Sequence, residues 1–334
     1  MGQEKILLTG GTGFVGHHLL RKLLNANQQF PVPIRAIYRS TSDPTIMKSL
    51  PSEIEWFEAD VLDVVALEDA FEGITHVYHA AAQISFNPSD YKSMRQINIE
   101  GTKNMVNQAL ESGVEKFIHL SSIAAISRPS GKKIVEGDPS KFENLPSEYG
   151  KTKYKAEMEI WRSIAEGLNA AIINPALILG PWKWNQSSAR LFDRDGFISK
   201  VYTNGETGFI DVLDVVDAMY LLMNSEVTAQ RFIVAGENLS LRTVFDWMAE
   251  DLEIEKPSFE SPEWLSAFMW RVLRVMHKLT GSDPLITQET ARTAHSQREY
   301  SGEKFAEQFQ FKYRSIREAV RRTCVIKKSG QRPY

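Results

Sequence analysis

Short apolar runs alternate with longer amphipathic stretches through the first 235 residues of the 334-residue chain. Each run spans four or five residues and is largely apolar, as expected of a strand that is buried on both faces of a parallel sheet. Strands of this kind alternating with helices are typical of an α/β fold. The predicted strands are residues 5–9, 34–38, 54–58, 76–79, 117–121, 170–173 and 231–235.

Between these runs, apolar residues recur every three or four positions, which is the period of a helix with one buried face. The predicted helices are residues 14–25, 65–71, 90–112 and 147–166. The elements together predict a doubly wound parallel sheet of the Rossmann type, with a ligand crevice at the carboxyl ends of its strands. Beyond about residue 175 the alternation becomes irregular and turn signals appear, as at Gly180-Pro181. We therefore expect a smaller, mostly C-terminal α/β lobe there.

A glycine-rich turn, TGGTGFVG at residues 9–16, connects the first strand to the first helix. Such a turn lets the backbone approach a pyrophosphate, and the helix start presents free N–H groups and a positive dipole end. The spacing of Gly10, Gly13 and Gly16 is GxxGxxG, which differs from the standard dinucleotide fingerprint GxGxxG. The turn alone therefore indicates a phosphate site, and the alternative is a tight strand–helix connection that binds no ligand.

Tyr149 and Lys153 lie four residues apart at the start of a predicted helix, so they share one face. A free phenol has a pKa of about 10, and a neighbouring ammonium group lowers it. The tyrosine can then act as a general acid or base. Ser121 and Ser122 end a predicted strand and could hold a carbonyl oxygen beside the phenol. The alternative is an ordinary exposed helix face.

Composition excludes several classes of function. With 39 Lys and Arg against 42 Asp and Glu, the chain lacks the basic surface of a nucleic-acid-binding protein. Cys324 is the single cysteine, and the seven histidines lack metal-ligand spacing, so we expect neither a disulfide nor a metal site. We place His17 and His18 on the surface. No apolar stretch is long enough for a transmembrane helix, and we expect a cytoplasmic protein.

Seven motifs, which follow one another along the chain from the glycine-rich turn at residues 9–16 to Asn174-Pro175, resemble those of the extended short-chain dehydrogenases/reductases. This superfamily includes nucleotide-sugar epimerases, dihydroflavonol reductases and 3β-hydroxysteroid dehydrogenases, and the resemblance extends over almost the whole chain. It implies that Ser122, Tyr149 and Lys153 are the catalytic set. Tyr149 would exchange a proton with the substrate oxygen, Ser122 would hold that oxygen, and Lys153 would bind the nicotinamide ribose and lower the pKa of Tyr149.

The same resemblance implies a nicotinamide dinucleotide. Asp60-Val61 resembles the pair that contacts adenine, Asn98 belongs to an NxxGT-like segment, and Asn174-Pro175 resembles the stretch beside the nicotinamide. The implied cofactor-binding residues are Thr9, Gly10, Thr12, Gly13, Phe14, Val15, Gly16, Arg39, Asp60, Val61, His79, Ala80, Ala81, Asn98, Lys153, Asn174 and Pro175.

The end of the second strand favours NADP(H). An NAD-selective site places a carboxylate there, which would repel a 2′-phosphate. Here Tyr38 is followed by Arg39, which resembles the arginine that binds the 2′-phosphate in the reductases. NAD(H) stays open, because Arg39 could instead stack on adenine or face solvent.

Departures from the family patterns narrow the reaction. Ser122 is followed by Ile123-Ala124, whereas dehydratases carry an Asp-Glu pair. The stretch 207–212 lacks the arginine that epimerases place just before it, although Arg190 could substitute. We therefore predict an NAD(P)-dependent oxidoreductase of the dihydroflavonol reductase and 3β-hydroxysteroid dehydrogenase branch. It would interconvert a carbonyl and a secondary alcohol on a small, largely apolar substrate. An epimerase with tightly bound NAD and a non-catalytic dinucleotide-sensing module remain as alternatives.

Residues 262–280 form an apolar helical pattern with a stripe of Arg271, Arg274 and Lys278. Three interpretations are open: a helix buried in the second lobe, a wall of an apolar substrate pocket, or a surface helix that contacts a membrane or a partner from Trp264 to Leu279.

On this pattern residues 1–175 form a dinucleotide-binding domain, to which residues 209–236 return. Residues 176–208 and 237–325 form the substrate lobe, and residues 326–334 a flexible tail. The resemblance also implies a homodimer through the helices at 90–112 and 147–166.

Overall fold

The computed structural model describes residues 4–27, 32–127, 133–137, 145, 147–193, 200–280 and 294–333, with the backbone alone for Asn27 and for residues 272–280. Its centre is a seven-stranded sheet in the order β10-β6-β5-β4-β1-β2-β3, in which every pairing is parallel. The predicted Rossmann-type α/β fold is confirmed, and all seven predicted strands belong to this sheet. Their bounds are β1 Ile6–Thr9, β2 Ile34–Tyr38, β3 Ile54–Glu58, β4 His76–His79, β5 Lys116–Leu120, β6 Ala170–Pro175 and β10 Gln230–Val234.

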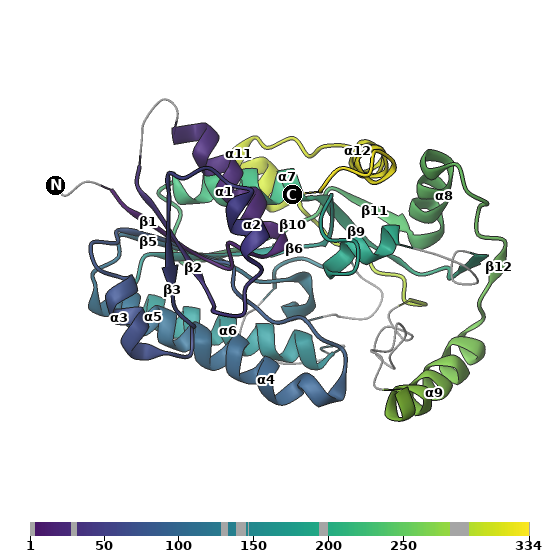
Figure 1. The fold of residues 1–334 in the computed structure, drawn as a ribbon, viewed down its shortest axis with the longest axis horizontal. Coiled ribbons are helices and arrows are strands. Elements are labelled where there is room, and N and C mark those ends of the chain that lie inside the picture. Colours follow the sequence, from purple (N-terminus) through teal and green to yellow (C-terminus); the bar gives the residue numbers. More distant parts are fainter. Residues whose placement is uncertain are drawn as a thin grey trace.

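Helices cover both faces of the sheet (Figure 1). One face carries α1 (Phe14–Asn27), α7 (Val212–Met223) and α11 (Glu303–Phe309), which share one apolar core with the strands. The opposite face carries α3, α5 and α6 over a second apolar core. The remaining helices of the larger part are short. Bounds not yet given are α2 Pro44–Lys48, α3 Val64–Ala70, α4 Tyr91–Arg95, α5 Gly101–Glu111 and α6 Glu148–Ala165.

The predicted helix at 90–112 is interrupted. A 3-10 turn at Pro88–Asp90 leads into α4, a π-helical turn occupies Gln96–Glu100, and α5 follows. Such π turns are frequent at functional sites. This turn carries Asn98, whose side chain is buried.

A smaller part packs beside the carboxyl end of the sheet. The sequence pattern did not predict its strands, most of which are short or partly polar. They are β7 Leu177–Leu179, β8 Val201–Tyr202, β9 Glu206–Asp211, β11 Glu237–Ser240 and β12 Phe259–Glu260, arranged as the sheets β11-β9-β7 and β12-β8. Three helices accompany them: α8 Leu241–Leu252, α9 Glu263–Thr280 and α12 Ile316–Lys328.

The segment expected to return to the main sheet does so only in part. β10 joins the seven-stranded sheet and α7 covers it, whereas residues 209–211 lie in β9 of the three-stranded sheet. α12 extends to Lys328 and so takes in the first residues of the expected tail. The division into two lobes stays a proposal.

The surface position expected for His17 and His18 is wrong. Both side chains are buried, because Trp182 from the smaller part packs against His17 and the backbone carbonyl of Pro181 lies 3.1 Å from His18 Nε2. Burial lowers the pKa of His17 to about 3. Within the described residues, no helix is both long and apolar enough to cross a bilayer.

Candidate active site

Ser122 and Tyr149 meet where the end of β5 packs against the start of α6. Ser122 is the second residue after the strand and caps a 3-10 helix at Ile123–Ala125, accepting a hydrogen bond from the Ala124 N–H at 3.1 Å. Ser147 caps α6 by accepting from the Gly150 N–H at 2.9 Å. A side chain on Gly150 would overlap the Ala124 carbonyl oxygen, so this glycine permits the close approach. As a result, the Tyr149 hydroxyl lies beside Ser122.

Lys153 lies one helical turn beyond Tyr149 and is fully buried. Its ammonium group donates to the Leu120 carbonyl at 2.8 Å and lies 3.4 Å from His119 Nε2. Burial lowers the pKa of Lys153 to about 8, and the Glu157 carboxylate acts in the opposite direction.

The Tyr149 phenol does not have the lowered pKa that we expected from a neighbouring Lys153. Burial instead raises the pKa of Tyr149 to about 12, with the hydrogen bond to Ser122 acting the other way. Removing the phenol from water outweighs the favourable contacts of the phenolate. The phenol is therefore protonated at neutral pH and can serve as a proton donor.

The glycine-rich turn packs tightly against the segment that follows β4. Gly10 has φ of +75°, and a Cβ there would lie 2.8 Å from Ala80 and Ala81 backbone atoms. A side chain on Gly16 would overlap the Gly10 carbonyl oxygen. The first turn of α1 carries no acidic residue that would repel a phosphate. Phe14 and Val15 are buried, so their side chains belong to the core.

Hydrogen bonds join the turn to the end of β4. Thr9 Oγ1 accepts from the Ala81 N–H at 3.1 Å and lies 2.8 Å from His79 Nδ1. The other ring nitrogen of His79 lies 3.0 Å from Thr102 Oγ1. His79 is fully buried, and burial lowers its pKa to about 3, so it packs the site as a neutral ring.

Four predicted cofactor residues, Thr12, Arg39, Asp60 and Val61, lie on loops that follow strands. Asp60 Oδ1 accepts a hydrogen bond from the Leu62 N–H. The Val61 side chain packs against Gly101, and a Cβ on Gly101 would lie 2.6 Å from it. Arg39 is exposed at the end of β2. Thr12 Oγ1 lies 3.5 Å from Ser42 Oγ, on the loop that follows Arg39.

Asn98 and Asn174 are buried amides beside the catalytic candidates. Asn98 accepts from the Gln83 N–H at 2.8 Å and donates to Thr152 Oγ1 at 2.9 Å, which ties the π turn to α6. Asn174 Nδ2 donates to the Ser122 carbonyl at 2.9 Å. Asn174 Oδ1 is buried without a partner among the described residues, so a donor on a bound cofactor could satisfy it. The glycine turn and this acceptor fit a nicotinamide dinucleotide.

Two charged residues beside the candidate active site were not predicted from the sequence. Glu157 and Arg231 are both buried and form an ion pair with an N–O distance of 3.0 Å. Glu157 lies four residues beyond Lys153, so helical spacing could have found it. Arg231 comes from a distant strand, and no local signal points to it.

An aromatic ring packs against Tyr149. The Phe86 ring stands edge-on to the phenol with centroids 6.2 Å apart, and the neighbouring Ile84 is exposed. Arg190, considered as an epimerase arginine, is exposed on a 3-10 helix at Ser187–Phe192. Within the described residues, no cluster of three or more His, Cys, Asp or Glu could hold a metal ion.

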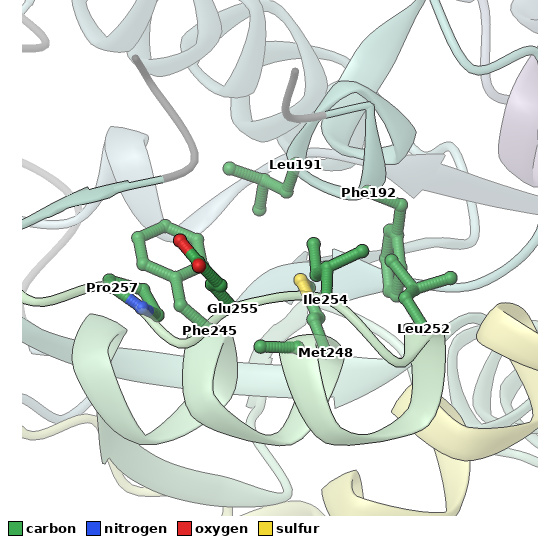
Figure 2. A pocket seen from close by; sticks show the side chains of 9 residues that line it. Leu191, Phe192, Phe245, Met248, Leu252, Ile254, Glu255 and Pro257 are labelled. Carbon is green, nitrogen blue, oxygen red and sulfur yellow. The ribbon is translucent and has the colours of Figure 1, made fainter. Parts of the chain in front are cut away.

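A second apolar recess lies between this 3-10 helix and α8 (Figure 2). Its volume of about 10 Å³ accommodates a single water molecule. None of the predicted site residues lines it. Its walls are made by Leu191, Phe192, Phe245, Met248, Ala249, Leu252, Ile254, Glu255 and Pro257.

At the start of α9 the Trp264 and Phe268 side chains are exposed, which argues against a helix buried on all sides. Arg271 is also exposed. Arg274 and Lys278 lie outside the described side chains.

This fold and site place the chain in a known class. The sequence profile of the NAD dependent epimerase/dehydratase family matches residues 6–236, and the chain belongs to this family. It is an enzyme, an NAD(P)-dependent extended short-chain dehydrogenase/reductase.

Individual relatives are similar over most of the chain. A putative dihydroflavonol 4-reductase of Synechocystis sp. is 29% identical over 324 residues, covering 94% of this chain and 91% of that protein. Sterol demethylase protein B of Methylococcus capsulatus is 29% identical over 259 residues, or 77% of each chain. The crystal structure of gox2253 superposes with a TM-score of 0.82 at 26% identity, covering 99% of this chain and 100% of that one.

Proposed function

We propose that the enzyme reduces a carbonyl, or oxidises the corresponding secondary alcohol, on a small and largely apolar substrate. The observation that carries this proposal is the convergence of Ser122, Tyr149 and Lys153. The Tyr149 hydroxyl lies beside Ser122, and Lys153 is buried one turn further along the same helix. These are the groups that carbonyl reduction needs for orienting and protonating an oxygen.

The chain's residues divide the work as follows. When bound, the nicotinamide supplies or accepts the hydride. Ser122 donates a hydrogen bond to the substrate oxygen, and Tyr149 gives its proton to that oxygen during reduction or removes it during oxidation. The Lys153 ammonium binds the nicotinamide ribose and favours the phenolate that remains. Because its pKa is raised to about 12, Tyr149 is in the form required for reduction at neutral pH.

An apolar substrate is supported by the surroundings of Tyr149 and by the relatives. The Phe86 ring would provide an apolar wall beside the phenol. The similarity to a putative dihydroflavonol 4-reductase and to sterol demethylase protein B favours a ring-containing ketone or alcohol over a nucleotide sugar.

Replacing Tyr149 by Phe tests the proposal. Turnover of ketones with NADPH should fall about 10²- to 10⁴-fold, the contribution of a general acid, while NADPH binding by fluorescence titration stays near native. Tyr154→Phe on the same helix is the matched control and should keep its turnover. A Tyr149→Phe enzyme with native turnover would refute the assignment. NAD released from the purified enzyme by denaturation, without net redox turnover, would favour an epimerase.

We propose NADP(H) as the preferred cofactor, supported by the exposed Arg39 at the end of β2. Arg39→Ala should then weaken NADPH binding about tenfold, the effect of losing about 1.4 kcal/mol, and leave NADH binding unchanged. Equal losses for the two cofactors would contradict this preference.

Two further proposals concern assembly and surface contact. α5 and α6 pack side by side on one face of the sheet, which supports a homodimer built on them; sedimentation velocity tests it. The exposed Trp264 and Phe268, with Arg271 nearby, support contact of α9 with an anionic membrane surface; co-sedimentation with vesicles containing phosphatidylserine tests it.

A further inference from the structure

The Glu157 carboxylate is fully buried beneath the site. Tyr149, Lys153 and Glu157 follow one another at intervals of four residues, so they line one face of α6. An isolated buried carboxylate costs several kcal/mol, so its partners must compensate.

Three neighbouring strands supply those partners. Glu157 Oε1 accepts from Asn174 Nδ2 of β6 at 2.6 Å and from the Ser121 hydroxyl at the end of β5. Glu157 Oε2 accepts from Arg231 Nη1 of β10 at 3.0 Å. Arg231 in turn donates through Nη2 to the Glu136 and Gly137 carbonyls.

Two of these contacts act on Ser122. Asn174 Nδ2 shares its donors between Glu157 Oε1 and the Ser122 carbonyl, so the carboxylate fixes which way the amide points. The Ser121 hydroxyl anchors the adjoining residue to the same oxygen. The position of Ser122 relative to α6 therefore depends on Glu157.

Glu157 also sets the electrostatic surroundings of Lys153. Among the described residues, the other titratable groups around Lys153 are His119 on β5, His79 on β4 behind it, and Tyr149 one turn away on α6. Burial lowers the pKa of both histidines, so they are neutral, and the phenol is protonated. Glu157 supplies the negative charge that favours the Lys153 ammonium.

We propose that Glu157, held by Arg231, is a positioning residue that fixes Ser122 and keeps Lys153 protonated for binding the dinucleotide. The inference rests on the proposed function, because it takes Lys153 as the residue that binds the nicotinamide ribose. It goes further in assigning the buried ion pair a part in cofactor binding.

The pH dependence of NADPH binding tests this inference without a known substrate. In the native enzyme the Kd should rise as Lys153 loses its proton near pH 8. The double variant Glu157→Gln/Arg231→Met removes both charges together, which avoids leaving one unpaired. Its midpoint should fall by about one pH unit or more.

Arg231→Gln gives a second test with the opposite sign. It retains Glu157 and removes the cation that neutralises it, so the midpoint should rise. Glu159→Gln is the matched control, because Glu159 pairs with Arg162 away from the site, and its midpoint should stay native. Circular dichroism confirms the fold of each variant.

The outcomes separate the inference from the proposed function. Lys153→Met should bind NADPH weakly, with no pH step near 8. If Lys153→Met binds like the native enzyme, the role proposed for Lys153 is wrong. If Lys153→Met loses the step but neither Arg231→Gln nor the double variant shifts it, the inference about Glu157 is overturned alone.

Discussion

Buried carboxylates meet arginines in two regions of the molecule, and the pairs differ in their access to water. Glu157 and Arg231 are 0% and 4% exposed. In the second region, Asp211 and Asp214 are equally buried, whereas their partners Arg322 and Arg314 are 34% and 40% exposed.

The difference in solvent exposure distinguishes an ion pair in the candidate active site from ion pairs that hold the C-terminal helix in place. Asp211 caps α7 and accepts two hydrogen bonds from Arg322 of α12, at 2.6 and 2.7 Å, so this pair ties the C-terminal helix to the body. Water can replace part of what Arg322 provides. Water cannot reach Glu157, so its charge acts strongly on neighbouring groups. In this protein the ion pair beside the candidate catalytic residues has both charges buried, whereas the ion pairs that attach helices to the body have one partner partly exposed.

The largest effect on stability should come from Arg231→Met. It leaves the Glu157 carboxylate buried and unpaired, which should lower the free energy of unfolding by about 3–5 kcal/mol in urea titrations. Removing both charges in Glu157→Gln/Arg231→Met should recover most of this loss. An Arg231→Met variant as stable as the native chain would show that water enters the pair and would remove the contrast.

Lys153→Met should change the free energy of unfolding in the opposite direction. It should stabilise the fold while it weakens NADPH binding. Burial lowers the pKa of Lys153 from 10.5 to about 8, so the buried ammonium destabilises the native fold by about 3 kcal/mol at pH 7. The variant also loses the hydrogen bond to Leu120, which offsets about 1 kcal/mol of the gain. The net gain should be about 2 kcal/mol by chemical denaturation at pH 7. A destabilised variant would contradict it.

The pH dependence of stability checks the cause of that gain. Between pH 8 and 10.5 the folded chain has released the Lys153 proton and the unfolded chain still binds it. The unfolding free energy of the native enzyme should therefore contain a contribution that rises with pH across this window. Lys153→Met should lack that rise, and an identical slope in both proteins would point to another group.

Arg322→Met should have the smallest effect, about 1–2 kcal/mol, because solvent can hydrate the Asp211 carboxylate once α12 loosens. NADPH binding should be native, since the pair touches no candidate site residue. A loss as large as that of Arg231→Met would show that exposure of one partner does not distinguish the two regions.

The sequence predicted the main sheet well because its strands are apolar runs whose burial is encoded locally. It missed β11 and β12, with sequences ENLS and FE, because their pairing is decided by neighbouring segments. It placed His17 and His18 wrongly for the same reason: residues 181 and 182 cover them from far along the chain.

The site shows the same limit. Tyr149 and Lys153 were recognisable because their spacing is fixed by one helix. The raised pKa of Tyr149 was not, because it depends on how much protein surrounds the phenol. Arg231 lies 74 residues from Glu157, and such a pair is visible only after folding.

The place of β10 at the edge of the sheet, beside β6, has a consequence for biosynthesis. A ribosome releases Glu157 well before it has made Arg231, so the nascent chain must bring α6 and β6 together without the guanidinium. Domains generally fold as units during translation, and here the unit cannot be completed at residue 175. A fragment ending there would expose the β6 edge and retain an unneutralised carboxylate, so we expect it to engage chaperones until strand β10 emerges.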